Sequence, residues 1–195
     1  MQRREFLAAL GTAGVGGLAG CGAIESDTTL SEPTVHADSH GRRSLRFTSD
    51  GEEIGSFGFD GGVSNGVIYL STELSHRAGT HVKSIAVRMW MPQAAPESAA
   101  TVAVVSPVEG DSSPPPSVSL YTPERDLGTV VEVTDLDDLK DETIDTLEFM
   151  VRPASETATT LAIDATVELT SSGWLGSGYT LDGQLQLEFP ELDAR

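Results

Sequence analysis

Two stretches near the end of this chain alternate between apolar and polar or small residues with a period of two. In Leu161–Leu169 and in Gly183–Phe189, every second residue is aliphatic or aromatic, and the residues between them are polar or small. This is the spacing of a β-strand that has one face on a core and the other in water. Because the Gly- and Ser-rich residues 171–178 separate the two stretches, the sequence predicts a hairpin near the C-terminus.

Shorter runs of β-favouring residues precede this hairpin, each bounded by Gly, Pro, Asn or Asp turn signals. They are Ser44–Thr48, Ile54–Phe59, Val67–Glu73, Val82–Met91, Thr101–Val105, Val118–Tyr121, Thr129–Val133 and Thr146–Val151. Residues 134–140 have early acids and leucines three apart, which predicts one or two helical turns. The pattern predicts an all-β protein with at most one short helix. We expect an antiparallel β-sandwich with an immunoglobulin-like topology, and a jelly roll remains open.

The N-terminus differs in composition from the rest of the chain. Two arginines are followed by an uncharged, Gly-rich run, residues 6–20, and then by Cys21, the only cysteine of the chain. This run is short of the roughly 20 apolar residues that span a bilayer. A charged head, an apolar stretch and a small-residue site in that order are typical of an export signal.

The signal resembles two known motifs. Residues 2–7 (QRREFL) are similar to a twin-arginine export motif, and residues 18–21 (LAGC) resemble the lipobox of lipoproteins. The resemblance implies cleavage before the cysteine and a lipid anchor on the extracytoplasmic face of the membrane. It assigns export to Arg3, Arg4, Phe6 and Leu7, the lipobox to Leu18, Ala19 and Gly20, and lipidation to Cys21. It implies no role for the remaining residues.

The chain has 30 acidic and 12 basic residues, a net charge of −18. Such a charge self-repels at low salt and is screened at molar salt. Acid-rich, lysine-poor surfaces are used by halophiles, and together with the signal the chain resembles surface lipoproteins of halophilic archaea. Nucleic acid is excluded as an expected partner because phosphate binding needs clustered Lys and Arg. Beyond the signal, residues 1–21, we expect a flexible acidic tether over residues 22–41 and one β-sandwich domain over residues 42–195.

Three motifs could carry chemistry. Residues 62–66 match G-x-S-x-G, but the strand expected after Ser64 and the Asn-Gly dipeptide favour a hairpin turn over a nucleophile elbow. His36, Asp38 and His40 form H-x-D-x-H, a weak metal candidate because a tether would not hold the ligands in place. The acid run between Asp135 and Asp145 lacks the glycine and glutamate that an EF-hand loop requires. We therefore predict no metal site and no cofactor.

Two tryptophans, Trp174 and Trp90, are candidate binding aromatics, since tryptophan is enriched in recognition patches. Either one could instead cover the core. The sequence favours a non-enzymatic, lipid-anchored module that binds an unknown protein or small-molecule ligand. An extracytoplasmic hydrolase with an unidentified site, and a surface protein that captures ions or solutes, are the alternatives.

Overall fold

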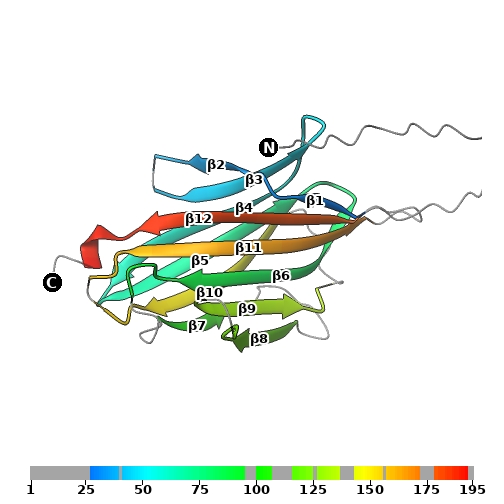
Figure 1. Ribbon diagram of the computed structural model, residues 1–195. Coiled ribbons are helices and arrows are strands. Elements are labelled where there is room, and N and C mark those ends of the chain that lie inside the picture. The colour runs from blue at the N-terminus through cyan, green and yellow to red at the C-terminus, as the bar shows by residue number, and fades with distance from the viewer. Residues whose placement is uncertain are drawn as a thin grey trace, which may run out of the picture.

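The computed structural model describes residues 27–39, 41–94, 100–106, 116–124, 127–136, 143–155, 157–171 and 178–192. Over these residues the chain forms two six-stranded β-sheets and a short 3-10 turn, η1, at Pro190–Leu192 (Figure 1). Within the same residues no helix is long and apolar enough to cross a membrane. The prediction of an all-β antiparallel sandwich is confirmed.

The two sheets have these strands, given in their order across each sheet. Sheet A consists of β1 (Thr28–Leu30), β12 (Tyr179–Glu188), β11 (Thr160–Ser171), β6 (Thr80–Trp90), β9 (Thr129–Thr134) and β8 (Ser117–Tyr121). Sheet B consists of β2 (Thr34–Ala37), β3 (Arg43–Ser49), β4 (Glu52–Ser64), β5 (Val67–His76), β10 (Thr143–Arg152) and β7 (Thr101–Ser106). Neighbouring strands are antiparallel apart from β1 and β12, which are parallel.

Each of the ten runs predicted from alternation is a strand, and the predicted C-terminal hairpin is the antiparallel pair β11–β12. The helix predicted over residues 134–140 is not found in its described part. Thr134 is the last residue of β9, and Asp135 has a left-handed φ of 61°, which ends the strand and is incompatible with a helix start. Residues 137–142 lie outside the described residues.

The tether predicted over residues 22–41 is wrong in its described part, because two strands lie within it. β1 pairs with β12, and β2 pairs with β3. The polar composition of the segment was misleading, because an edge strand needs backbone partners on one side and only a few apolar contacts. Leu30 supplies such a contact by packing against the core. The domain therefore begins before residue 42.

The core lies between the sheets and is mainly aliphatic, with phenylalanines contributed by sheet B. Phe57 and Phe59 are both fully buried, and their ring centroids are 4.6 Å apart at a tilted angle. The largest fully buried side chains are those of Phe47, Phe57, Phe59, Phe149, Leu45, Ile54, Ile68, Leu70, Leu74, Ile85, Met89 and Leu136. Because successive side chains of a strand alternate between faces, the charged residues between them are turned outward.

The two sides of the sandwich are built differently. At one side the chain passes from β1 of sheet A to β2 of sheet B, and Pro33 in this connection packs against Gly183 of β12. A Cβ added at Gly183 would lie 2.7 Å from Pro33 Cγ, so this close approach requires glycine. At the other side the last strands are β8 in sheet A and β7 in sheet B (Figure 1).

Gly128 and Gly41 provide a matched test of backbone strain against packing. Both have a left-handed φ, +98° and +89° respectively, but a Cβ at Gly128 would meet Met89 and Trp90 whereas a Cβ at Gly41 would meet nothing within 4 Å. We expect Gly41→Ala to lower the free energy of unfolding by about 1 kcal/mol and Gly128→Ala by about 2–4 kcal/mol. Urea unfolding of the two variants measures the difference, and equal losses would contradict the close packing of β9 on β6.

Candidate functional site

Ser64 of the G-x-S-x-G motif is the last residue of β4, and Asn65 and Gly66 form the turn into β5. Val63 pairs with Ile68 and Ser64 pairs with Val67, so the loop has two residues. Asn65 and Gly66 both have positive φ, 52° and 74°, as a type I′ hairpin turn requires. The preference for a hairpin over a nucleophile elbow is confirmed.

The metal candidate is split between strand and loop. His36 is exposed on β2, and Asp38 follows that strand, where its carboxylate accepts a hydrogen bond from the backbone N–H of Arg42 at 3.1 Å. His40 lies outside the described residues. In the part of the chain that the structure describes, no three His, Cys, Asp or Glu side chains are grouped as metal ligands.

Several predicted residues cannot be placed. The export residues, the lipobox, Cys21 and Trp174 all lie outside the described residues. Their assignments remain predictions.

Trp90 is the predicted binding aromatic that the structure places. It is the last residue of β6 and is half-buried on the outer face of sheet A. The guanidinium carbon of Arg88, two residues earlier on the same face, lies 4.8 Å from the centroid of the Trp90 ring, within the range of a cation–π contact. This contact holds the ring against its own strand.

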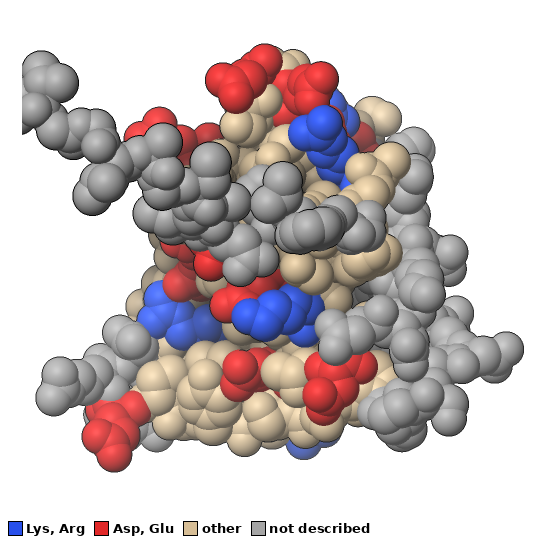
Figure 2. Space-filling view, turned by 90° about the vertical axis from the view of Figure 1, so that its right-hand side faces the viewer, with Lys and Arg blue, Asp and Glu red and all other residues tan. Residues whose placement is uncertain are grey.

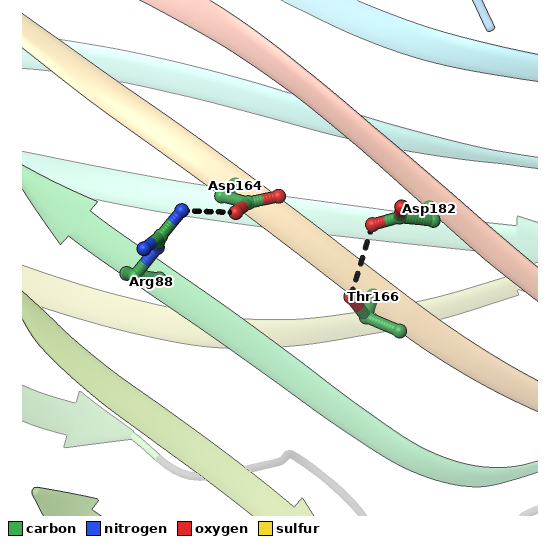
Figure 3. Close-up of polar contacts among 4 residues, drawn as sticks. All are labelled: Arg88, Asp164, Thr166 and Asp182. Atoms are coloured by element: carbon green, nitrogen blue, oxygen red, sulfur yellow. Dashed lines mark hydrogen bonds and ion pairs between the residues drawn. The ribbon is translucent and has the colours of Figure 1, made fainter. Parts of the chain in front are cut away.

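Arg88 is in turn held by Asp164 on the neighbouring strand β11. The two residues are directly paired across the strands, and Arg88 Nη2 donates to Asp164 Oδ2 at 2.6 Å (Figure 3). Both side chains are about three-quarters buried, with 26% and 30% of their surface exposed. A charge-assisted bond that is partly shielded from water is stronger than an exposed ion pair.

The residues paired with Arg88 continue across sheet A to its edge strand β8. Val130 of β9 pairs with Arg88 on one side and with Tyr121 of β8 on the other, so all three side chains are on the outer face. Val130 is buried there, while Tyr121 is 48% exposed. We call the group Arg88, Trp90, Val130, Tyr121 and Asp164 the Trp90 surface. It joins an aromatic ring, a fixed cation and an exposed phenol, which suits contact with another molecule.

The Trp90 surface lies toward the end of the sandwich that is remote from the beginning of β1. Thr28 pairs with Tyr179, which pairs with Leu169 of β11. Trp90 pairs with Ala162 of the same strand. The seven residues between these two positions of β11 correspond to roughly 23 Å along the strand.

Polar contacts continue along the outer face of sheet A toward β1. Thr166 of β11 donates to Asp182 of β12 at 3.2 Å (Figure 3), and Lys83 of β6 contacts Glu168 of β11 at 2.9 Å. Figure 2 shows Lys and Arg side chains lying beside Asp and Glu at the end of the sandwich where β1 begins. The few cations of this acidic chain are thus placed among its carboxylates.

An open cleft of about 330 Å³ lies at the opposite end, between the two sheets. The residues that line it include Arg43, Gly61, Gly62, Glu188 and Glu191. One of these carboxylates is engaged, because Thr160 donates to Glu188 at 2.9 Å. The cleft therefore has mixed charge.

Sequence reasoning identified Trp90 but missed Asp164 and Tyr121. Arg88 and Asp164 are 76 residues apart, and only the pairing of β6 with β11 brings them together. The available signal was that each lies at an outward position of a strongly alternating strand. Tyr121 was recognised only as a strand residue.

Comparison with known proteins gives a matching family model and solved structures of low similarity. A family model described as "Domain of unknown function (DUF8121)" matches residues 27–191. No curated protein matches this chain. The collagen-binding domain of a Staphylococcus aureus adhesin has 9% sequence identity and a TM-score of 0.35, covering 65% of this chain and 95% of its own. The collagen adhesin from S. aureus has 8% identity and a TM-score of 0.35, covering 84% and 97%.

The Lys83–Glu168 contact predicts a pH dependence of stability. The hydrogen bond from Lys83 lowers the pKa of Glu168 below its ordinary 4.5, and partial burial opposes it. Because the folded pKa is lower than the unfolded one, the pair stabilises the fold above pH 4.5, and this contribution is lost as pH falls through the folded pKa. Lys83→Met should remove it, lowering the free energy of unfolding at neutral pH by less than about 1 kcal/mol.

Urea unfolding at neutral pH and at a pH below the pKa of Glu168 measures this contribution. Lys83→Arg, which keeps the cation, is the matched control. A Lys83→Met variant with the same loss at both pH values would contradict an electrostatic origin.

Proposed function

This chain belongs to the DUF8121 family, and we propose that it is an exported, lipid-anchored surface domain of a halophilic archaeon that binds or assembles with another molecule. The export residues and Cys21 would attach it to the extracytoplasmic face of the membrane. The Trp90 surface would be its recognition site. The feature that supports this proposal best is the exposed Tyr121, which lies across Val130 from Arg88, the residue that contacts Trp90.

The position of the Trp90 surface supports the anchored arrangement. A tether from Cys21 reaches the domain at β1, because Thr28 is only seven residues further along the chain. The residues of the Trp90 surface are displaced by five to seven positions, roughly 17–23 Å, along the strands from that point. A lipid anchor at Cys21 would thus leave this surface turned away from the bilayer.

The chemistry of the Trp90 surface supports recognition. The ion pair with Asp164 and the ring of Trp90 fix the Arg88 guanidinium from two sides, which reduces the side-chain entropy lost on binding. Trp, Tyr and Arg are the residues most enriched among those that dominate binding energy. The surface combines all three on β6 and β8, the two strands that flank β9.

The alternative of a hydrolase has less support. Its candidate nucleophile, Ser64, pairs with Val67 across a two-residue turn and so continues the ladder of β4 and β5. A nucleophile elbow instead places its serine between a strand and a helix.

Intact mass and membrane partitioning test the anchor. We expect the native protein to begin at Cys21 with a lipid-sized mass increment and to partition with membranes. Cys21→Ser should lose both properties and appear in the soluble fraction. A native protein that retains Met1 and stays in the cytoplasm would overturn the proposed location.

Binding to isolated envelopes from cells that lack the protein tests the recognition role. We expect saturable binding by the purified chain and a loss of about tenfold in affinity for Tyr121→Ser, since dominant contacts are worth 1–2 kcal/mol or more. Tyr69→Ser is the matched control, because Tyr69 is an exposed tyrosine, 46% accessible, on sheet B. Non-saturable binding, or equal effects of the two substitutions, would contradict the proposal.

A further inference from the structure

We propose that the free edge of β8 is the docking site for a partner segment that adds to sheet A as a further β-strand. The segment would be extended and would alternate cationic with aliphatic residues. This inference rests on the proposed function, because it names the kind of partner that the binding module would recognise.

Within β8 itself none of the usual protections against strand addition is present, although Pro116 directly precedes the strand. Its residues, Ser-Val-Ser-Leu-Tyr, include no charge and no proline, and its register with β9 is continuous from Ser117 to Tyr121. No described strand pairs with its other side. Edge strands are normally blunted by charges, prolines, bulges or very short length.

The other three edges are protected in these ways. β7 has a register shift that leaves Val105 without a partner on β10, as in a bulge. β1 has only three residues. β2 lies beside Arg43 and Arg46 of β3, which would repel a cationic segment. An incoming strand of positive charge is therefore directed to β8.

Leu120 shows that the core is incompletely covered at this edge. It pairs with the buried Val131, so its side chain is on the core side of sheet A, yet 46% of its surface is exposed. Val118, on the same side, is only partly buried against the core. A strand placed beside β8 would bring its own inward side chains next to Leu120 and Val118 and shield them from water.

Two carboxylates near the outer side of β8 favour cationic side chains in the partner segment. Ser117 and Ser119 are small, and behind them on the outer face are Asp135, bonded to Ser117 at 2.6 Å, and Glu132, which pairs with Ser119. An added strand would be about 9.6 Å from β9, twice the usual strand spacing. A Lys or Arg side chain of the added strand is long enough to extend over the small serines of β8 and reach Glu132 or Asp135.

A second copy of the chain fits this edge less well. Its own β8 has no cation to offer Glu132 or Asp135, and each copy has a net charge of −18. A cationic partner compensates both carboxylates. Charge complementarity therefore favours a basic segment over self-association.

The test uses the purified chain with the peptide acetyl-Lys-Val-Lys-Val-Lys-amide as probe. We expect saturable binding and slower amide hydrogen exchange at alternate residues of β8, those whose N–H groups point away from β9. β7 should show no change. A peptide of the same composition with the alternation removed, Lys-Lys-Lys-Val-Val, and the acidic Glu-Val-Glu-Val-Glu should both bind at least tenfold more weakly.

Protein variants locate the site. Leu120→Lys places a charge on an already exposed edge position and should weaken binding of the probe tenfold or more. Glu132→Gln should weaken it about twofold to fivefold, as loss of a partly exposed ion pair does. Glu53→Gln, which makes the same charge change at an exposed position of β4, is the control and should leave binding unchanged.

Four results would overturn the inference. They are binding without protection of β8, binding that Leu120→Lys leaves intact, a dimer of the unbound chain that pairs through β8, and envelope binding that Leu120→Lys does not weaken. The last of these would leave the proposed function standing, with recognition confined to the outer face. Absence of envelope binding by the wild type would instead refute the proposed function, while protection of β8 by the probe would still support strand addition at this edge.

Discussion

The structure depends on one constraint, that each strand must present apolar side chains to a single core while its backbone pairs with its neighbours. In the central pair β6–β11, buried Val87 opposes buried Ala165, and one residue away Arg88 opposes Asp164 on the outer face. The same register therefore forms part of the core and part of the Trp90 surface. A slip of one residue would put both charges into the core and destroy both features.

Much of the fold was accessible from the sequence, because period-two alternation depends only on local burial. The ten strands found in this way are those that present alternate apolar side chains to the core. β1 and β2 were missed because their pairing partners, β12 and β3, cover them on one side only and the segment has few apolar residues. The order of strands in each sheet was not predictable, because it depends on contacts between residues far apart in sequence.

The candidate site was predicted only in part, for the same reason. Trp90 is conspicuous as a single residue, but Asp164, which holds its partner Arg88, comes from β11, and Tyr121 comes from β8. Alternation does not predict that these strands lie in one sheet with β6. Leu120 gives a further example. In sequence it is an ordinary strand residue, and only the structure shows that a core-facing leucine remains exposed. Incomplete burial of this kind depends on which strand lies beside the residue, so no local sequence pattern predicts it.

The parallel pairing of β1 with β12 has a mechanical consequence. If Cys21 is held in a membrane and a partner pulls on the distal end, tension enters the domain at Thr28 along the axis of β1. The hydrogen bonds between β1 and β12 then lie across the direction of pull, so they bear the load together and in shear. Peeling them apart one at a time would require much less force. The short first strand would thus act as a clamp between the anchor and the folded domain.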